Sequence, residues 1–445
     1  MNPCTRNPLQ RKSEPASSLQ ERAHQLIPGG CHTYAKGDDQ FPESAPAFIV
    51  RGQGAHSWDI DGNQYIEYGA GCRAVALGHA YPEVIEAVQK ELAHGTNFSR
   101  PAPIEVEAAE EFLSLIDGAD MVKFAKDGSN CTTAALKLAR AYTGRDHVAL
   151  CGSHPFFATN DWFIGTTAID AGIPESIKQL SHTFTYNDLP SLERLFEQYP
   201  DQIACVILEP AKYDEPEDNF LHKAQELCRL HGAVFVLDEM ITGFRWHEKG
   251  AQHVYNITPD LSTFGKAIAN GFSVSALAGK RELMELGGLN HPRERVFLLS
   301  TTHGAETHAL AAAIATMRIY QREPVVETLH RQGMHLKNGL EQVIRDHQLQ
   351  DYVKIHGRPC SMVWSSAGPD GKHSQDYRTL LMQETIRHGV IAPSLVISYS
   401  HTDLDVEQTV RAFDRALDVY EAALNDGVEK FLQGAPTQSV YRKWN

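Results

Sequence analysis

The chain has 445 residues, of which 42% are hydrophobic, so it can bury a large core and is expected to divide into more than one lobe. It carries 41 Lys and Arg against 56 Asp and Glu, a formal net charge of −15, which argues against nonspecific binding to nucleic acid or to an anionic membrane. The sequence contains neither a membrane-spanning apolar run nor an apolar signal core, so a cytoplasmic location is expected.

The cysteines and histidines lack the spacings of a structural site. Eight cysteines are scattered without a CxxC pair, and the 22 histidines form no HExxH motif. Disulfide frameworks and zinc sites depend on such spacings. We therefore predict neither a disulfide framework nor a structural metal.

The N-terminal fifth of the chain predicts a small antiparallel meander. Positions 1–18 are polar and contain several prolines, which predicts a flexible arm, and a helical pattern begins near Leu19. Strand-like runs follow at 47–52 and 56–67, joined and bounded by turn residues. We assign positions 19–80 to the N-terminal part of a small lobe.

The middle of the chain predicts a doubly wound lobe. Across positions 81–308, helical stretches such as 133–142 alternate with apolar runs such as 204–208, which is the signature of repeated βαβ units. The predicted fold class is therefore α/β, with a large lobe built on a doubly wound, mostly parallel sheet.

The C-terminal part predicts helices around a second, short meander. Positions 309–430 contain long helical patterns, a strand-like run near 362–364 and a final helix near 406–424. We expect this α+β part to join the N-terminal meander, so that the smaller lobe is built from both chain ends. Positions 431–445 are interpreted as a weakly packed tail.

A lysine and an aspartate in the middle region together predict a cofactor. Asp238 ends the apolar run 233–239, at the edge where open α/β sheets bind ligands. Lys266 is flanked by glycine and small apolar residues, a setting that lowers a lysine pKa. Either residue alone could be an ordinary surface residue. Together they predict pyridoxal phosphate (PLP) chemistry, in which Lys266 forms a Schiff base and Asp238 holds the ring nitrogen protonated.

A glycine-containing turn before the helical stretch 133–142 predicts a phosphate site. Backbone N–H groups at a helix start bind anionic oxygens, and Gly128 allows close approach. Gly128, Ser129 and Asn130 are therefore candidate cofactor contacts. An ordinary helix N-cap explains the same residues, and that alternative remains open here.

A second carboxylate, Glu209, follows the run 204–208, one βαβ unit before Asp238. Both carboxylates should reach the same edge of a parallel sheet. Glu209 is therefore a candidate to face the cofactor or the substrate, with a surface residue as the alternative.

Several of these motifs resemble one enzyme family. The run 235–245 and Phe264-Gly265-Lys266 resemble the class III aminotransferases of PLP fold type I. Within that family, four further motifs are similar to the glutamate-1-semialdehyde 2,1-aminomutases, at 27–30, 77–79, 138–145 and 392–394. The resemblance extends from about Leu19 to Leu424 and implies a homodimer with shared active sites.

The resemblance assigns roles around the cofactor. It implies that Lys266 carries PLP, that Asp238 pairs with the pyridinium nitrogen and that Gly128 and Ser129 hold the phosphate. It also implies that Met240 packs on one face of the ring. These roles are expectations taken from the family.

Two further cofactor contacts are open between neighbouring residues. The stretch 300–306 resembles the loop in which a threonine of the second subunit binds the phosphate, which favours Thr301 and leaves Thr302 as the alternative. For the other ring face, a gap-free match places His154 where the aminomutase has an aromatic residue, and a local shift would place Phe156 there instead.

The expected substrate contacts depart from the aminomutase pattern. Lys36 stands near the position where that enzyme has an arginine for the substrate carboxylate, and a lysine cannot make the same two-pronged contact. Arg73 lies in a segment where the family has tryptophan and glycine, and we expect it to take over anion binding. His32 and Tyr34 add polar donors and favour an oxygen-rich substrate, although such loop residues are also common without a ligand.

The sequence thus predicts an aminotransferase that acts on small molecules. We expect it to move an amino group from an amino-acid donor such as glutamate to the carbonyl of a polar, sugar-like acceptor. The alternative is a glutamate-1-semialdehyde aminomutase of tetrapyrrole biosynthesis, and a PLP racemase or epimerase would share every cofactor residue. A noncatalytic interaction protein is disfavoured because Lys266 and Asp238 are both present. No nucleic-acid or membrane partner is expected.

Overall fold

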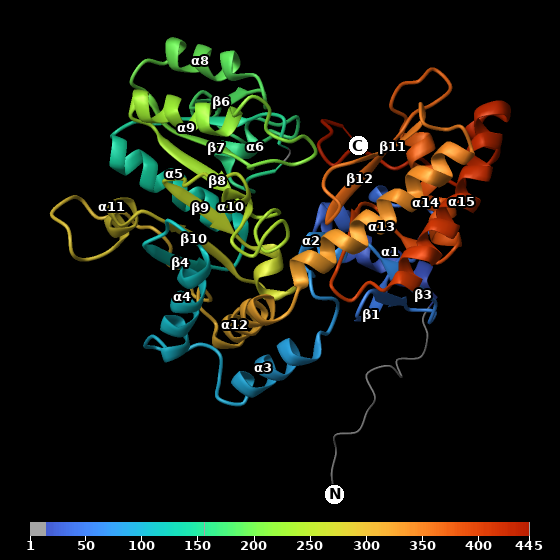
Figure 1. Ribbon diagram of the computed structural model, residues 1–445, viewed down its shortest axis with the longest axis horizontal. Helices are drawn as coiled ribbons and strands as arrows, with labels where there is room; N and C mark the ends of the chain where they lie inside the picture. The colour runs from blue at the N-terminus through green and yellow to red at the C-terminus, as the bar shows by residue number, and fades with distance from the viewer. Residues whose placement is uncertain (1–14, 155, 445) are drawn as a thin grey trace, which may run out of the picture.

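The computed structural model describes residues 15–154 and 156–444, which form a larger and a smaller lobe (Figure 1). The larger lobe is built on a seven-stranded sheet. Its strands, in spatial order, are β4 (Met121–Ala125), β10 (Ser275–Gly279), β9 (Leu261–Phe264), β8 (Val234–Asp238), β7 (Ile203–Leu208), β5 (His147–Cys151) and β6 (Ser181–Phe184). Only β10 runs antiparallel to its neighbours, so the predicted α/β class with a mostly parallel sheet is confirmed.

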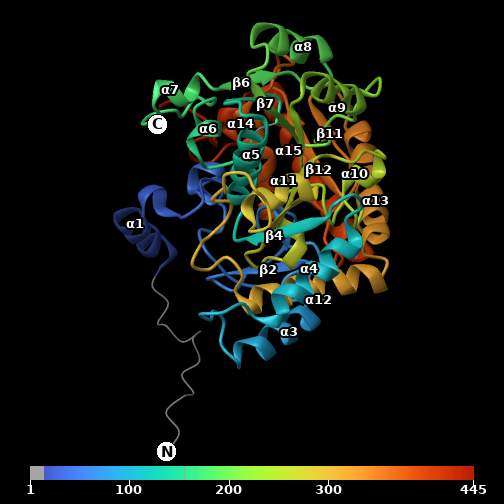
Figure 2. The same ribbon diagram turned by 90° about the vertical axis from the view of Figure 1, so that its left-hand side faces the viewer.

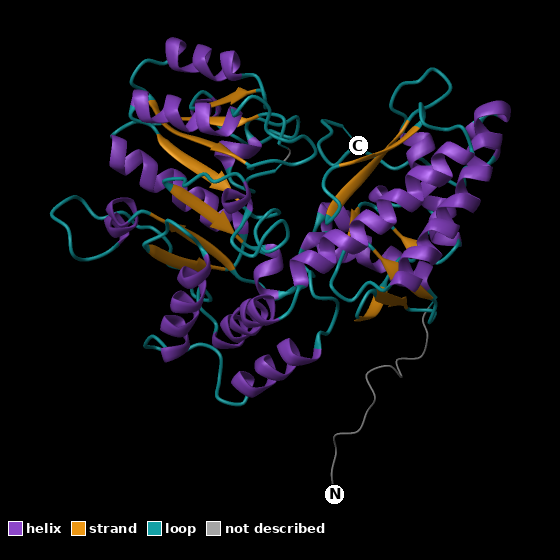
Figure 3. Ribbon diagram, viewed as in Figure 1, coloured by secondary structure: helices purple, strands orange, loops and turns teal. Residues whose placement is uncertain are grey.

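Helices enclose this sheet, as Figure 3 shows. The longer ones are α3 (Pro82–Leu92), α4 (Pro103–Leu115), α5 (Gly128–Thr143), α8 (Leu189–Gln198), α9 (Phe220–His231) and α12 (Thr307–Arg322). Short helical turns are α6 (Asp161–Ile164), α7 (Glu175–Lys178), α10 (Ala251–Val254), α11 (Arg281–Met284), η4 (Lys266–Ala269) and η5 (Glu285–Gly287). Every residue of β7 and β8 is buried, which explains why both strands read as continuous apolar runs rather than as alternating ones.

The smaller lobe joins the two ends of the chain through a four-stranded sheet. Its order is β1 (Ile49–Gln53), β2 (His56–Asp59), β3 (Gln64–Glu67) and β13 (Val390–Ile391). The first three strands form the antiparallel meander expected from the sequence, and β13 pairs parallel with β3, placing Val390 beside Ile66. Residues near the C-terminus thus complete a sheet begun near the N-terminus.

Three helices and a second small sheet complete this lobe. The helices are α13 (Val325–Asp346), α14 (Gln375–Arg387) and α15 (Asp403–Asp426), and the sheet contains β11 (Val353–His356), β12 (Ser361–Ser366) and β14 (Leu395–Val396). Local side chains determine where α15 begins: Thr402 Oγ1 accepts the Asp405 N–H at 3.2 Å, and Asp405 Oδ2 accepts the Thr402 N–H at 2.8 Å. This capping box satisfies two N–H groups at the start of the helix.

The N-terminal segment lies at the flank of the molecule (Figure 2). Helix α1 (Ala16–Leu26) has no buried residue and begins a few positions before the expected start near Leu19. Three short 3-10 turns follow, η1 (Pro28–Gly30), η2 (Tyr34–Lys36) and η3 (Asp38–Gln40), and η6 (Val428–Lys430) follows α15. Most of the arm expected at positions 1–18 lies outside the described residues. No helix in the described ranges is long and apolar enough to cross a membrane.

The C-terminal segment corrects the expectation of a weakly packed tail. Thr437 is buried, and its N–H donates to Thr379 Oγ1 at 2.8 Å. The Gln438 N–H donates to the Asp39 carbonyl at 2.9 Å, and Arg442 Nη1 lies 2.7 Å from Asp39 Oδ2. The sequence did not reveal this packing because both partners are far away along the chain.

Candidate active site

Three charged residues meet at the carboxyl edge of the large sheet. Glu209 follows β7, Asp238 ends β8, and Lys266 follows β9. These strands are parallel, and their register places Asp238 beside Thr263 of β9. The predicted pair of Asp238 and Lys266 is therefore found at one edge of the sheet, together with Glu209.

Asp238 is a buried carboxyl with two donors on one oxygen. Its Oδ1 accepts the Met240 N–H at 2.9 Å and the Thr263 hydroxyl at 3.1 Å. Burial, followed by the negative charge of Glu209, raises the pKa of Asp238 to about 7, although Lys266 acts in the opposite direction. A cation placed beside this carboxyl would stabilise its negatively charged form. The carboxyl is therefore suited to pair with a protonated ring nitrogen.

Lys266 has the character expected of a nucleophilic amine. Burial lowers its pKa, the carboxylates of Asp238 and Glu209 oppose this shift, and the nearby cations Arg73 and Lys212 add to it. Its Nζ makes no hydrogen bond or ion pair with any residue of the described ranges. The backbone φ of 47° lies in the left-handed region, which is strained for a non-glycine residue. The amine is therefore free to attack an aldehyde.

The start of α5 offers open donors for an anionic group. Asp127 caps this helix, and its carboxylate accepts the Asn130 N–H at 3.0 Å. The N–H groups of Gly128 and Ser129 have no acceptor among the described residues. Ser129 Oγ accepts the Thr159 N–H at 3.0 Å. Of the three candidates, Gly128 and Ser129 thus keep open backbone donors, whereas that of Asn130 is occupied.

The Met240 side chain lies between the start of α5 and the segment Gly265–Lys266. A Cβ atom at Gly128 would lie 2.9 Å from Met240 Sδ, and one at Gly265 would lie 2.6 Å from it. Both separations are too short for real carbon–sulfur contacts, so the two glycines make room for this side chain. Met240 is thereby placed beside both the phosphate candidates and Lys266.

The structure separates the two candidates for the other ring face. His154 is buried, its Nδ1 accepts the Glu209 N–H at 3.0 Å, and its ring centroid lies 5.0 Å from that of Tyr186. Burial lowers the pKa of His154 to about 4, so the imidazole is neutral at pH 7. Phe156 is exposed and packs edge-on against Phe163. This arrangement favours His154 over Phe156 as a cofactor contact.

Glu209 has a partner that the sequence analysis did not identify. Lys212 Nζ lies 3.3 Å from Glu209 Oε1; the Glu209 side chain is buried, and that of Lys212 is 10% exposed. Burial works against the charge of Glu209, but Lys212, His154 and Lys266 hold its pKa below the usual value. The other oxygen, Oε2, is buried and has no partner within the described residues. The only sequence signal was a lysine three positions after Glu209.

A small cavity lies beside these charges. It is lined by Arg73, Lys212, Tyr213, Ile241, Trp246 and Ser361. Of these residues, only Arg73 was predicted to contact substrate. The cavity therefore joins residues from both lobes, which sequence reasoning could not place side by side.

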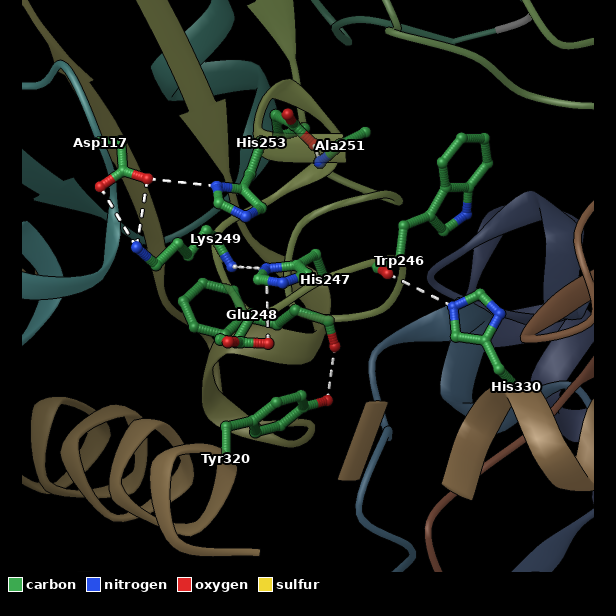
Figure 4. A network of polar contacts seen from close by, with 11 residues as sticks. Asp117, Trp246, His247, Glu248, Lys249, Ala251, His253, Tyr320 and His330 are labelled. Atoms are coloured by element: carbon green, nitrogen blue, oxygen red, sulfur yellow. Dashed lines mark hydrogen bonds and ion pairs between the residues drawn. The ribbon is translucent and has the colours of Figure 1, made fainter. Parts of the chain in front are cut away.

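Polar contacts fix the segment after β8, which contributes Trp246 to the cavity wall (Figure 4). His330 Nε2 donates to the Trp246 carbonyl at 3.3 Å and so connects this wall to α13. Further along, Lys249 Nζ and His253 Nδ1 both lie 3.2 Å from Asp117 Oδ2. The segment that carries Trp246 is thus fixed at several points.

Glu239, next to Asp238, has a structural role that can be tested by stability. It is fully buried, and its two oxygens accept the Ala251 and Gln252 N–H groups at 2.9 and 2.7 Å and the Thr242 hydroxyl. Glutamine at position 239 would present an NH₂ group to one set of donors. We expect Glu239→Gln to lower the free energy of unfolding by about 1–3 kcal/mol in urea titrations.

The matched control for this prediction is Glu226→Gln. Glu226 is exposed and pairs with Arg229 on α9, so its replacement should change stability by less than about 1 kcal/mol. An equal loss in the two variants would refute the structural role of Glu239.

Five of the predicted contacts are exposed in the single chain. His32, Tyr34 and Lys36 are exposed, and none of them lines the cavity that contains Arg73. Thr301 and Thr302 are also exposed. Their proposed roles stay predictions.

Comparison with known proteins identifies the family. The family model described as aminotransferase class-III matches residues 34–412. The chain belongs to the class III aminotransferases. Among curated relatives, a glutamate-1-semialdehyde 2,1-aminomutase of Syntrophomonas wolfei is 32% identical over 434 residues, covering 91% of this chain and 98% of the relative.

Solved structures of similar proteins share the fold of this class III aminotransferase. The Sphingopyxis sp. MTA144 FumI protein, in its PLP internal aldimine form, matches with 30% identity and a TM-score of 0.84, covering 95% of this chain and 98% of that one. An omega-transaminase from Sphaerobacter thermophilus matches with 26% identity and a TM-score of 0.82, covering 93% and 100%. The predicted family, PLP fold type I and transaminase class are confirmed.

The described residues fit PLP, the cofactor of class III aminotransferases. The N–H groups of Gly128 and Ser129 are open for a phosphate, and the buried carboxyl of Asp238 suits a ring nitrogen. The Oε2 atom of Glu209 is buried without a partner in the described ranges, as expected of a group that faces a ligand. The predicted cofactor is confirmed by the family, and the residues that hold it are proposed below.

Proposed function

We propose that this class III enzyme transfers an amino group from an amino-acid donor such as glutamate to the carbonyl of a polar small molecule. The observation that carries the proposal is the position of Lys266, whose lowered pKa and unpaired amine coincide with the buried carboxyl of Asp238 at one sheet edge. A merely structural lysine in such a place would be paired with a carboxylate.

Lys266 and Asp238 have complementary chemical roles. When bound, PLP supplies an aldehyde for the lysine and an electron sink for the charge that develops at the substrate Cα. Lys266 Nζ holds the cofactor at rest and, once released, removes the Cα proton as general base and returns it as general acid. Asp238 keeps the ring nitrogen protonated through its carboxylate.

The remaining cofactor contacts are assigned by position. The Gly128 and Ser129 N–H groups donate to the phosphate, and Met240 and His154 pack on the two ring faces. In a homodimer, Thr301 of the partner subunit adds a hydroxyl to the phosphate. The exposure of Thr301 in the single chain supports this assignment.

The second candidate function is that of an aminomutase, which the names of curated relatives favour. Besides the relative from Syntrophomonas wolfei, one from Natranaerobius thermophilus with the same name is 31% identical over 419 residues. Against it stand Lys36 and Arg73, where the residues depart from the aminomutase pattern. A mutase moves the amino group within one substrate, whereas an aminotransferase uses a separate donor.

A donor panel distinguishes the two functions. The PLP-loaded enzyme is mixed with glutamate, alanine and a diamino acid, and the conversion to the pyridoxamine form is followed by absorbance. We expect glutamate to convert the enzyme in a single half-reaction, with one amino group taken up per active site. Conversion by the diamino compound alone would favour the aminomutase and overturn the proposed aminotransferase.

The acceptor can be examined with the pyridoxamine-loaded enzyme. We propose a polar, oxygen-rich acceptor of the sugar type because His32, Tyr34 and Lys36 lie close together in the N-terminal part of the small lobe. A panel of keto sugars and simple aliphatic ketones of equal size should show preference for the former. Equal rates would remove these three residues from the proposal.

A further inference from the structure

A second cavity lies in the smaller lobe, between α15 and the sheet that contains β2, β3 and β13. Its volume of about 330 Å³ is within the range of small-molecule sites, about 300–1000 Å³. None of its lining residues belongs to the candidate active site. Figure 1 shows α15 at the edge of the smaller lobe, on the side away from the large sheet. The cavity is therefore a candidate site for a second ligand.

One face of α15 forms the first wall of this cavity. Gln408, Arg411, Ala412 and Arg415 all line it, and they are spaced as i, i+3, i+4 and i+7, which is the pattern of a single helix face. A helix face turned toward a neighbouring sheet is ordinarily apolar. Here only Ala412 is both apolar and buried. The face instead places two arginine side chains in the cavity wall.

The opposite wall adds further polar groups. Gln64 of β3 and His388, just after α14, line it, and their side chains make no hydrogen bond with any residue in 15–154 or 156–444. His56 of β2 also lines it, and its Nε2 lies 3.0 Å from Oδ1 of the buried Asp405. This pair holds the His56 ring in place and leaves its other nitrogen available to a ligand.

The charged groups in the cavity wall favour an anion. Neither Asp nor Glu lines the cavity. Arg415 has no hydrogen bond or ion pair in the described part of the chain, and Arg411 has only an exposed partner, Glu407, at 3.7 Å. Exposed pairs of this kind contribute little. Asp414, which lies between the two arginines in the sequence, pairs with His347 at 3.0 Å instead. The two guanidinium groups are thus available to a ligand.

The spacing of the arginines favours a phosphate over a carboxylate. Residues four positions apart on a helix have Cβ atoms about 5–6 Å apart, so both guanidinium groups can reach one anionic group. A single guanidinium already occupies both oxygens of a planar carboxylate. A phosphate ester has three acceptor oxygens in a tetrahedral arrangement and can be shared by two arginines.

We propose that Arg411 and Arg415 bind the phosphate group of a small molecule in this cavity, and that Gln64 and Gln408 donate hydrogen bonds to its other oxygens. Two sources can supply the group, free inorganic phosphate and a phosphorylated organic molecule. The volume of about 330 Å³ leaves room for the second. This site is separate from the proposed aminotransferase site and does not depend on it.

The test is a calorimetric titration of the dialysed PLP-loaded enzyme in a buffer without phosphate. The probes are glucose 6-phosphate, glucuronate, glucose and inorganic phosphate. Glucuronate carries a carboxylate where glucose 6-phosphate carries its phosphate-bearing group, and glucose carries no charge. We expect one glucose 6-phosphate per subunit, bound at least about 10-fold more tightly than glucuronate, and no measurable binding of glucose.

Variants of the two arginines locate the bound probe. Arg411→Gln and Arg415→Gln should each weaken the binding of glucose 6-phosphate by about 10-fold, and the double variant should abolish it. Both side chains are exposed, so the variants should fold. The double variant should also keep its conversion by glutamate, since the cavity is separate from the candidate active site.

The matched control is Arg194→Gln. Arg194 is exposed on α8 of the larger lobe and lies 3.7 Å from Asp188, the same separation as between Arg411 and Glu407. It does not line the cavity, so its replacement should leave the affinity for glucose 6-phosphate within about 2-fold of wild type.

The outcomes separate the proposed site from its alternatives. Glucose 6-phosphate that binds the double variant as tightly as wild type would overturn the site, because the probe would then lie elsewhere. Glucuronate that binds as tightly as glucose 6-phosphate would overturn the choice of phosphate. Weaker binding of inorganic phosphate supports the organic source, and equal binding supports the free ion. Failure of glutamate to convert the wild type would refute the proposed function and leave this site intact.

Discussion

Replacing Lys266 with alanine should lower kcat by at least about 10⁴-fold. The variant loses the amine that holds the cofactor and the group that moves the Cα proton, and positioned acid–base groups alone contribute about 10²–10⁴-fold. The free backbone donors of Gly128 and Ser129 remain, so the variant should still bind PLP without a covalent link. Steady-state rates and gel filtration after mixing with PLP measure both effects.

The control for this variant is Lys223→Ala. Lys223 is exposed on α9 and does not line the cavity beside the site, so the replacement should leave kcat within about 2-fold of wild type. If Lys266→Ala retained more than a hundredth of the wild-type rate, another residue would have to carry the proton.

Asp238→Asn should produce the second largest loss, about 10²–10³-fold in kcat. The amide oxygen can still accept the Met240 N–H and the Thr263 hydroxyl, so the fold around β8 is retained. The amide cannot keep a ring nitrogen protonated, and the electron sink is weakened. PLP affinity, measured by quenching of tryptophan fluorescence, should fall together with the rate.

Asp351→Asn is the matched exchange away from the site. Asp351 is exposed just before β11, and its replacement should change neither kcat nor PLP affinity. An Asp238→Asn enzyme with a normal rate and normal PLP affinity would show that this carboxyl serves only the packing of β8.

The large sheet could be predicted because its central strands are apolar throughout. In β7 and β8 every residue is buried, so the sequence runs near 204–208 and 233–239 show continuous hydrophobicity. The packing of the C-terminal segment could not be predicted in this way. Its contacts are made by polar groups such as Thr437 and Thr379, whose pairing depends on the fold rather than on any local pattern.

The site was predictable where a motif lies within one stretch of chain. Asp238 ends one recognisable strand and Lys266 follows the next, so their meeting at one edge follows from parallel topology. The hydrogen bond from the buried Arg245 Nη2 to the Arg73 carbonyl could not be predicted, because the two residues lie 172 positions apart in the chain. The left-handed turn at Ala70–Arg73 was also hidden, since only one of its four residues is glycine.

The most direct test of the account is to locate the covalent link between PLP and the chain. The PLP-loaded enzyme is reduced with borohydride, digested and mapped by mass spectrometry. We predict that the cofactor-derived mass increase is found on the peptide that contains Lys266 and on no other lysine in stoichiometric amount. A label on a different lysine, or no label on an enzyme that is active, would contradict the central claim.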